Sequence, residues 1–377
     1  MSQVEVVPVV GSKQQKQFLA LPWKINAGDP NWVPPLRANQ RLLAGFGEHP
    51  FYNDAQTQQF LALRGGKPVG RISAIINHAH NRTQKDKVGF FGFFESVDDP
   101  AVSGALFDAA GAWLAEREMT VIRGPANPSL NYEWSMLIDG FDTPPFFMMT
   151  HNPPYYPALV EASGFAKAQD LFAFYGEVAM LQELKKDTKV IRIDQQIRER
   201  FGVTVRDMDR SRFREEVEMF LRIYNEAMSQ TWGHVPLSKA EIHHLAAELK
   251  HLIVPELAIV AEVEGEPVGV VFALLDYNTR IKKIDGRLYP FGFLRLLYNK
   301  RAIKRIRLVS TNVIPKYQSW GVGVTLAYAM LGPSLKFGIR EAEFSWVLES
   351  NDLSRKSLEK GGALKYKKYR VYDKPLA

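Results

Sequence analysis

Segments of this chain recur at one spacing of 199 residues, and this repeat limits the possible folds more than any other feature. A short apolar strand, a Gly-x-Pro turn between two apolar runs and an asparagine that opens a helical stretch each occur twice. The paired positions are Val4 with Val203, Gly66 with Gly265 and Asn152 with Asn351. Because unrelated segments rarely share one spacing, we interpret the chain as two copies of a single structural unit.

Each copy is predicted to run strand, helices, hairpin, strand, helix, strand, helix, strand. The central strand–helix–strand implies a right-handed parallel crossover within an otherwise mostly antiparallel sheet. In the second copy, these three elements are expected at 306–314, 321–337 and 342–349. The predicted class is therefore α/β (α+β), with two tandem domains that each hold a mixed sheet flanked by helices. We place the domains at 1–185 and 186–377.

The composition excludes several classes of protein. Of the 377 residues, 46% are apolar and 24% are charged, which is typical of a globular chain. Apolar runs are shorter than the roughly 18–20 residues of a membrane span, and the N-terminus lacks a signal-peptide pattern. The absence of cysteine excludes disulfides and thiolate chemistry, and it fits the cytoplasmic location that we expect. A net charge of +7 favours anionic ligands.

A strand-to-helix turn in the second copy carries the strongest ligand signal. An apolar strand ends at Pro315, and a Gln-x-x-Gly-x-Gly turn from Gln318 to Gly323 leads into an apolar helix. Glycines allow backbone N–H groups to converge on an anion, and the helix adds the positive end of its dipole. A dinucleotide-binding fingerprint would need a third glycine where Leu326 stands. The turn therefore predicts a pyrophosphate site of another kind.

These residues resemble the GNAT superfamily of acyl-CoA N-acyltransferases over roughly 203–373. One motif is Val313-x-Pro315 followed by the Gln-x-x-Gly-x-Gly turn, and the other is Asn351-x-x-Ser354 continuing to Gly362. The first half resembles the same fold without the ligand motif, because Glu95, Asp98 and Asp99 replace the turn. Carboxylates would repel a pyrophosphate. The chain thus looks like a tandem GNAT protein with a degenerate N-terminal copy.

The resemblance implies a donor site in the second copy. In this family the two parallel strands part, and the pantetheine of acetyl-CoA or another acyl-CoA lies between them. Backbone amides of the turn would then hold the pyrophosphate, Val313 would offer main-chain groups and Asn351 a side-chain hydrogen bond. The expected donor-binding residues are Val313, Gln318, Ser319, Trp320, Gly321, Val322, Gly323, Asn351 and Ser354. No metal is expected.

The chemistry implied is direct attack of an amine on the acyl thioester, which needs a base. Glu349, at the end of the last parallel strand, is the candidate base, with an ordinary surface carboxylate as the alternative. Leu358 stands where many relatives carry a tyrosine that serves as the acid for the leaving thiolate. The loop between the first two helices is the expected acceptor site, with Asn225, Trp232 and His234 as its binding residues, although a plain turn would explain part of it.

Three further features leave alternatives open. The insert 125–151 of the first copy is rich in Asn, Tyr, Trp and Pro, and could belong to a substrate pocket or domain interface, or form a rigid packed loop. Residues 280–307 combine ten basic residues with apolar ones, which suits a membrane, a nucleic acid, a coenzyme phosphate or a solvated helix. His243, His244 and His251 on one helix, and His78 and His80 on a strand, lack the partners of a metal site.

The function predicted from these features is transfer of an acetyl or other acyl group from acyl-CoA to a small-molecule or peptide amine. One alternative is an aminoacyl transferase that uses charged tRNA on paired GNAT-like domains, so nucleic acid is a possible but less favoured partner. The other is a non-catalytic acyl-CoA-binding module. The sequence leaves the acceptor, the acyl length and the oligomeric state open.

Overall fold

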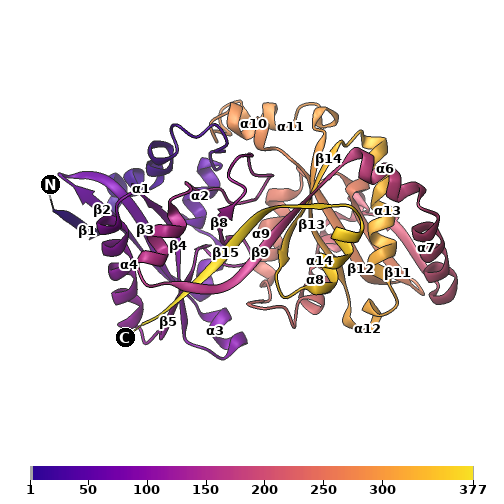
Figure 1. Cartoon of the computed structure of the whole chain (residues 1–377), viewed down its shortest axis with the longest axis horizontal. Helices are drawn as coiled ribbons and strands as arrows, with labels where there is room; N and C mark the ends of the chain where they lie inside the picture. The colour runs from indigo at the N-terminus through magenta and orange to yellow at the C-terminus, as the bar shows by residue number, and fades with distance from the viewer. Residues whose placement is uncertain (1–2, 377) are drawn as a thin grey trace. The chain divides into compact units, whose positions relative to one another are not determined.

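The structure is a computed structural model that describes residues 3–376. It divides into two compact units (Figure 1). The first unit comprises residues up to 171 together with 278–296 and 367 onwards, and the second comprises 172–277 and 297–366. Each unit holds a mixed sheet with helices packed against it, which confirms the predicted fold class.

The first unit is built mainly from the N-terminal half of the chain. Its helices are α1 (Gly11–Ile25), α2 (Arg37–Leu43), α3 (His78–Gln84), α4 (Pro100–Ala115), α5 (Tyr156–Ala162) and α10 (Asn278–Lys283), with most of α11 (Gly292–Leu297). Its strands are β1 (Val4–Pro8), β2 (Ala55–Arg64), β3 (Lys67–Asn77), β4 (Val88–Ser96), β5 (Val121–Gly124), β6 (Ala126–Asn127), β7 (Glu133–Trp134) and β8 (Met136–Asp139).

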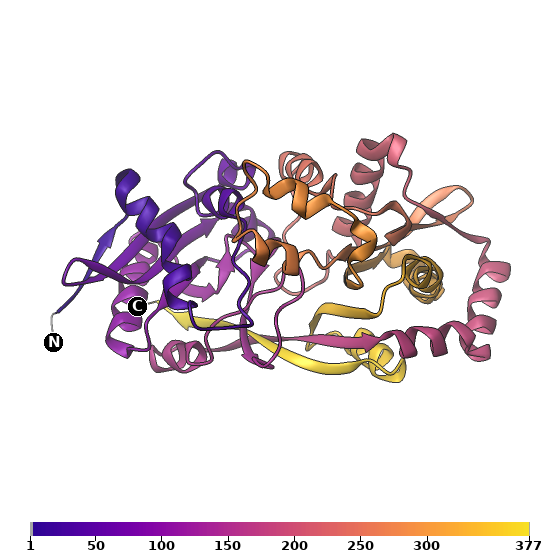
Figure 2. The same cartoon turned by 90° about the horizontal axis from the view of Figure 1, so that it is seen from above.

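The second unit repeats this order of elements. Its helices are α6 (Val178–Lys186), α7 (Thr188–Phe201), α8 (Phe213–Ala227), α9 (Lys239–Leu249), α12 (Pro315–Gln318), α13 (Val322–Phe337) and α14 (Asp352–Lys360). Its strands are β10 (Val203–Asp207), β11 (Ala258–Val263), β12 (Glu266–Leu275), β13 (Arg305–Val313) and β14 (Glu341–Leu348). Two long strands, β9 (Ala166–Glu177) and β15 (Leu364–Pro375), run from one unit into the other (Figures 1 and 2).

The sheets have matching topologies. In the first unit the order is β1-β2-β3-β4-β5-β15, and in the second it is β10-β11-β12-β13-β14-β9. Pairing is antiparallel from β1 to β4 and from β10 to β13, and the next pair is parallel in both units. A helix joins the parallel strands each time, α4 in one unit and α13 in the other. This is the crossover that the sequence predicts.

Helices cover both faces of each sheet, and strand glycines let a helix approach closely. A Cβ atom placed on Gly269 would lie 3.0 Å from Leu326 of α13, whereas the next residue, Val270, packs in the cluster of Ile223 from α8. Successive strand residues point to opposite faces, so α13 and α8 lie on opposite sides of the sheet. Gly70 stands in the same relation to α4, since its Cβ would lie 2.8 Å from Leu106.

The predicted boundary at 185/186 falls where α6 ends at Lys186 and α7 begins at Thr188. Both helices belong to the second unit, and the first unit also receives residues 278–296 and the chain end from 367. The two units are defined by contacts and the predicted boundary by the sequence repeat, so the boundary stays a prediction. One local prediction is wrong: His78 and His80 begin helix α3 instead of lying on a strand, because the Asn77 side chain accepts a hydrogen bond from the His80 N–H and caps the helix.

Candidate functional site

In the second unit, two parallel strands pair at one end and then part. The register of β13 with β14 runs from Arg305 opposite Glu341 to Leu308 opposite Phe344, and the described residues show no pair of these strands beyond it. On its other edge, β13 stays paired with β12 to Val313. Phe272 and Ala273, which are consecutive in β12, pair with Ser310 and Leu308 of β13. Val309 is therefore left unpaired and forms a bulge at the point where β13 and β14 part. Beyond Leu308 and Phe344 there is thus a gap in the ladder between β13 and β14.

The turn from Gln318 to Gly323 lies directly beyond the end of β13. Gln318 donates its side-chain amide to the Val313 carbonyl at 3.0 Å, which holds the turn against the strand. Gly321 is the N-cap of α13 with φ of 85°, a backbone conformation that favours glycine, and no side chain caps the helix. The first N–H groups of a helix have no acceptors within it. The start of α13 therefore presents backbone donors and a positive dipole end.

Aromatic packing supports this turn from one side. Trp320 stacks on Phe201 of α7 with ring centroids 4.6 Å apart, and Tyr317 meets Trp320 edge-on. A Cβ at Gly321 would lie 2.8 Å from Ile197 of the same helix. Gly323 is open instead, since the nearest atom to its Cβ position is Val313 Cγ2 at 4.0 Å. The side chain of Trp320 thus supports the turn, and the space beside Gly323 is free of protein atoms.

The second motif lies at the end of β14. Asn351 is the N-cap of α14 and accepts a hydrogen bond through Oδ1 from the Ser354 N–H at 3.1 Å. Ser354 is therefore placed by the same cap. Glu349 follows β14 directly and is half-buried. Leu358 packs against the apolar cluster of Phe172 and Phe174, and its hydrocarbon side chain has no group for acid–base chemistry.

A cavity of about 620 Å³ lies where the end of α8 meets the end of β13. It is lined by Arg222, Asn225, Glu226, Ser229, Ile314, Pro315 and Lys316. Only Asn225 among these residues was predicted as a site residue, although Pro315 belongs to the predicted turn motif. The lining comes together only when the end of α8 meets the end of β13. Two of the lining side chains, Arg222 and Lys316, are cationic and one, Glu226, is anionic, so the lining carries a net positive charge.

The other two predicted acceptor residues lie outside the lining of this cavity. His234 is buried, meets the Tyr224 ring edge-on at 5.7 Å, and has a pKa lowered by burial. Burial also raises the pKa of Tyr224 to about 12. Asn225 accepts a hydrogen bond from the Leu237 N–H at 3.3 Å, so it also shapes the loop. Trp232 is half-buried in the same loop. The contacts of His234 are those of a packed loop, and acceptor binding by these three residues stays a prediction.

A buried polar cluster that the sequence analysis missed lies where β13 and β14 part. Glu343 is fully buried and accepts hydrogen bonds from the Ser345 hydroxyl at 2.5 Å and from the Tyr366 hydroxyl. Arg307, its partner in register, donates to the Ser345 hydroxyl at 2.8 Å and lies 3.9 Å from the Glu343 carboxylate. Alternating polar residues from Glu341 to Ser345 could have indicated it. The cluster fixes the end of the gap.

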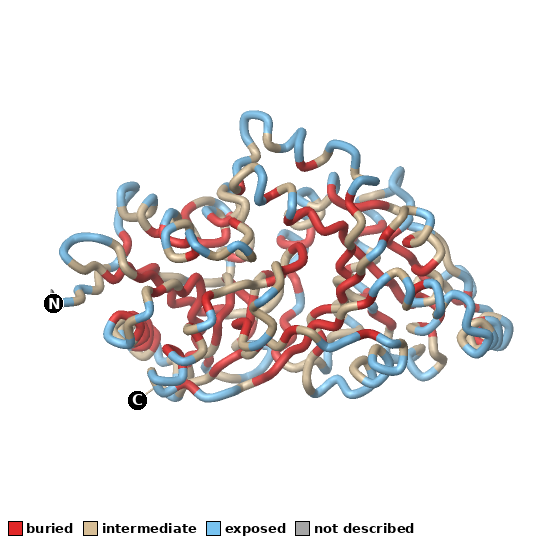
Figure 3. Tube along the Cα trace, turned by 45° about the horizontal axis from the view of Figure 1, so that its top comes forward, coloured by how far each residue is buried: buried red, intermediate tan, exposed pale blue. Residues whose placement is uncertain are grey.

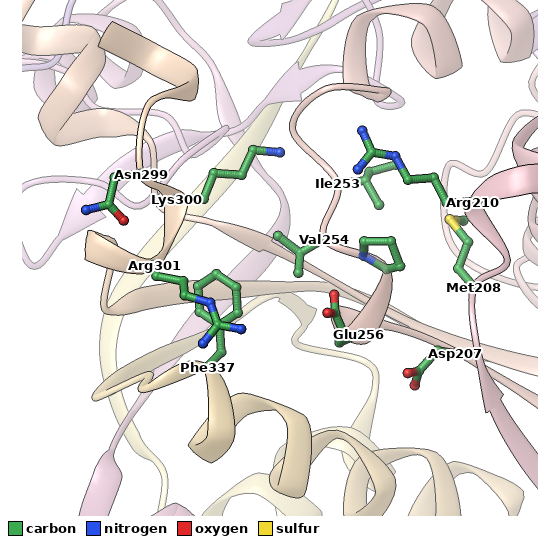
Figure 4. A pocket seen from close by; sticks show the side chains of 11 residues that line it. Asp207, Met208, Arg210, Ile253, Val254, Glu256, Asn299, Lys300, Arg301 and Phe337 are labelled. Carbon is green, nitrogen blue, oxygen red and sulfur yellow. The ribbon is translucent and has the colours of Figure 1, made fainter. Parts of the chain in front are cut away.

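A second cavity of about 620 Å³ lies elsewhere in the second unit (Figure 4). Acidic residues, among them Asp207 and Glu256, face basic ones, and Arg301 lies 5.8 Å from the Phe337 ring. Burial and the neighbouring Glu256 carboxylate raise the pKa of Asp207. None of the predicted site residues lines this cavity, so we do not include it in the site. No group of three or more metal-ligating side chains occurs within residues 3–376.

The matching region of the first unit is filled by its own chain. Strands β4 and β5 pair from Val88 to Phe90 and then part, but residues of the insert occupy the gap. A Cβ at Gly92 would lie 1.9 Å from the Ala126 carbonyl oxygen, and Asn127 accepts a hydrogen bond from the Phe93 N–H at 2.6 Å. The part of the insert around Ala126 and Asn127 is therefore a packed loop. It leaves no room for a pantetheine.

The start of α4 is closed as well. Asp99 caps this helix by accepting from the Ala101 N–H at 2.9 Å, and it pairs with Arg64 at 2.5 Å. Hydrogen bonds from the Arg64 guanidinium and from backbone N–H groups lower the pKa of Asp99. Glu95 is held by Tyr156 at 2.6 Å and lies 3.5 Å from Arg71. A carboxylate therefore stands at the start of α4, where α13 has a bare glycine.

Comparisons with known proteins agree with this geometry. No family model matches the chain. Among curated proteins, it is 38% identical to "Bacterial ceramide synthase" of Caulobacter vibrioides, over 99% of this chain and 98% of that protein. It is 34% identical to "Protein YghO" of Escherichia coli, over 96% and 93% respectively.

The fold also matches solved structures across the whole chain. A tandem GNAT protein from the clavulanic acid biosynthesis pathway aligns with a TM-score of 0.59 and 11% identity, covering 100% of this chain and 99% of that one. A GCN5-related N-acetyltransferase from Sphaerobacter thermophilus aligns with a TM-score of 0.52 and 12% identity, covering 99% and 96%. The chain belongs to the family of the Caulobacter ceramide synthase, and it has the tandem GNAT fold.

Proposed function

We propose that this enzyme transfers a fatty acyl group from acyl-CoA to the amine of a long-chain amino alcohol, forming a ceramide-type amide. The observation that carries the proposal is 38% identity, over nearly the full length of both chains, to a protein named as a ceramide synthase. The open start of α13 beside the parted strands supports acyl-CoA as the donor.

The second unit would hold the donor. The backbone donors from Gln318 to Gly323 would bind the pyrophosphate, because a helix start without a capping side chain has unsatisfied N–H groups and a partial positive charge. The pantetheine would enter the gap between β13 and β14 and pair with their main-chain groups. Lys316 and Arg222, in the cavity beside the turn, would add positive charge near the phosphates.

The chemical step would be direct transfer within a complex of both substrates. The amine lone pair attacks the thioester carbonyl carbon, a C–N bond forms, the C–S bond breaks and the coenzyme leaves as a thiolate. We assign stabilisation of the developing oxyanion to a backbone N–H at the bulge around Val309, where the strands part. Glu349 would accept the proton that the amine loses, directly or through water. The low basicity of a thiolate lets it leave although Leu358 replaces the usual tyrosine.

The test is a transfer assay with a panel of donors and acceptors. The chain contains no cysteine, so a thiol-reactive dye reports coenzyme release without a background from the protein. Long-chain acyl-CoA with a long-chain amino alcohol should give thiol release and the expected amide by mass spectrometry. A short amine and a peptide serve as acceptor controls. Release only with a short amine or a peptide would overturn the lipid acceptor, and failure to bind any acyl-CoA in calorimetry would overturn the donor.

The same assay separates the alternative of transfer from charged tRNA. Aminoacyl-tRNA replaces acyl-CoA as donor, and tRNA binding is measured at increasing salt, since phosphate contacts weaken steeply with ionic strength. We expect no amide from this donor. Salt-sensitive tRNA binding with aminoacyl transfer, and no reaction of acyl-CoA, would favour the tRNA-dependent function instead.

A further inference from the structure

Exposed apolar side chains of this protein concentrate in one short stretch of the first unit. Among the described residues, nine large apolar side chains are classed as exposed, and four of them lie within residues 289–294. Their exposed fractions are 78% for Tyr289, 74% for Phe291, 40% for Phe293 and 55% for Leu294. A fifth, Tyr298, follows along the chain. Single exposed apolar residues are common, but such a cluster marks an interaction surface.

Basic residues flank these apolar ones on both sides in the sequence. Lys282, Lys283, Arg287 and Arg295 are all exposed. The single acid of the stretch is Asp285, which is engaged by Arg37 at 2.5 Å and by the Trp23 indole N–H at 2.6 Å. We call residues 282–295 the aromatic–basic segment. It includes the turn between α10 and α11, the orange helices labelled in Figure 1. The segment is exposed for most of its length (Figure 3).

Contacts with Trp23, Pro35 and Arg37 of the same unit hold the segment in place. Arg37 also donates to the Asp285 carbonyl at 3.0 Å, and its guanidinium lies 4.0 Å from the Trp23 ring. A Cβ at Gly286 would lie 2.1 Å from the Pro35 carbonyl oxygen, so the turn is seated closely on this loop. Arg280 ties the two helices by donating to the Leu296 carbonyl at 2.8 Å, and Leu296 is buried. The backbone that carries the exposed aromatic side chains is therefore fixed to the rest of the first unit.

We propose that the aromatic–basic segment docks the protein on an anionic lipid bilayer. Tyr289 would enter the interface between headgroups and acyl chains, where its amphipathic ring is favoured, and Phe291 and Phe293 would follow it by leaving water. The flanking lysines and arginines would lie against the anionic headgroups, which attract basic segments next to a membrane. Because no helix within residues 3–376 has the length and apolar character to cross a bilayer, this docking is peripheral.

Charge and chemistry favour a membrane over a nucleic acid. The tip carries an aliphatic leucine and two phenylalanines with its tyrosine, and apolar side chains that gain energy by leaving water favour a lipid phase. Unpaired bases would stack on the exposed rings but would leave the aliphatic Leu294 without an apolar partner. The inference does not depend on the proposed substrates, because binding to a vesicle requires neither donor nor acceptor.

The test is co-sedimentation of the full chain with phosphatidylcholine vesicles, with and without phosphatidylglycerol. The wild type should bind the anionic vesicles and bind neutral ones much more weakly. The double variant Phe291→Ser/Leu294→Ser should bind anionic vesicles roughly tenfold more weakly, because it loses two apolar side chains from the interface. Arg287→Gln/Arg295→Gln should lose most of the preference for anionic vesicles.

The matched control is Leu353→Ser/Leu364→Ser, which removes two leucines that are 79% and 68% exposed outside the segment. It should bind vesicles like the wild type, and all variants should melt like the wild type because the replaced side chains are exposed. Absence of wild-type binding, an equal loss in the control, or displacement of vesicles by an RNA oligonucleotide would overturn the proposal. Acyl transfer is measured separately in detergent, so failure of one test leaves the other interpretable.

Discussion

The helices α4 and α13 hold the same place in the two copies, but they begin differently. Asp99 caps α4 and pairs with Arg64, so its charge satisfies the donors that an anion would otherwise bind. Gly321 begins α13 without a side chain, and its donors remain open to a ligand. The neighbouring gaps differ in the same way, because Ala126 and Asn127 fill the first. One fold thus carries a closed copy and an open copy.

The two matching asparagines show how the first copy was closed. Asn152 makes two hydrogen bonds with Leu137, one through each side-chain atom, and so fastens strand β8 of the insert. Asn351 instead caps α14 through Oδ1. The same residue type at the same repeat position therefore holds an insert in one copy and orders a helix start in the other.

The largest effect is expected from giving α13 the acidic character of the α4 start. Gly323→Asp should weaken acyl-CoA binding about a hundredfold or more, roughly 3 kcal/mol, because a carboxylate would face the pyrophosphate. Calorimetry with acyl-CoA measures this. Gly323→Ala is the control and should bind nearly as tightly as the wild type, since its Cβ meets no atom closer than 4.0 Å. Equal affinity of the aspartate variant would remove the turn from the donor site.

The second largest effect is expected at Glu349, because the first copy has no carboxylate at the matching position. Glu349 corresponds to Thr150 in the first copy by the 199-residue spacing. Glu349→Gln should lower kcat roughly a hundredfold while acyl-CoA affinity stays unchanged, because it removes a general base without altering shape. Single-turnover kinetics with calorimetry separates the two quantities.

The comparison variant is Glu343→Gln, which alters the buried cluster with Arg307. Taking the charge from one member of a buried pair leaves the other uncompensated, so this variant should mainly lower the melting temperature. A wild-type kcat in Glu349→Gln, with a selective loss of kcat in a well-folded Glu343→Gln, would transfer the role of base to Glu343.

A smaller effect tests whether the first gap is filled. Gly92→Ala should destabilise the protein by about 2 kcal/mol, because its Cβ would lie 1.9 Å from the Ala126 carbonyl oxygen and the insert must shift. Urea unfolding followed by fluorescence measures this, with Gly104→Ala in the same unit as the control, since a Cβ there meets nothing within 4 Å. Equal stability of the two variants would show that the insert does not close the gap.

The smallest effect concerns the cap of α4. Asp99→Asn keeps a capping side chain but loses the ion pair with Arg64, and should destabilise the protein by about 1 kcal/mol or less at neutral pH. The pKa of Asp99 is lowered in the folded state, so its stabilisation is present above the ordinary aspartate pKa and is lost as the pH falls through the lowered value. The difference from the wild type in urea unfolding should therefore vanish in acid. A difference that grows on acidification would contradict this assignment.

The repeat and the motif turn were predictable because each depends on local sequence. The strands β1 and β10 begin at Val4 and Val203, as the spacing predicts. Gly321 adopts the positive φ that favours glycine, and Gln318 folds back on the end of β13. Local turn chemistry and strand periodicity specify such features before any tertiary contact forms.

The rest of the site could not be predicted because it depends on contacts between distant segments. The cavity lining joins the end of α8 to residues beyond β13, and Arg307 meets Ser345 from another strand. His234 has the composition of a binding residue, yet its burial against Tyr224 follows from packing.

The sequence by itself determined that this chain holds two copies of one fold and that a glycine turn leads into the helix of only one copy. The tertiary structure alone decided how the other copy is closed, since Asn127 reaches the Phe93 N–H across 34 residues of chain. It also decided that the aromatic–basic segment is anchored through Asp285 to Trp23 and Arg37, far away in the sequence. Short-range patterns fix turns and strands, whereas burial and the filling of a gap depend on which distant segments pack together.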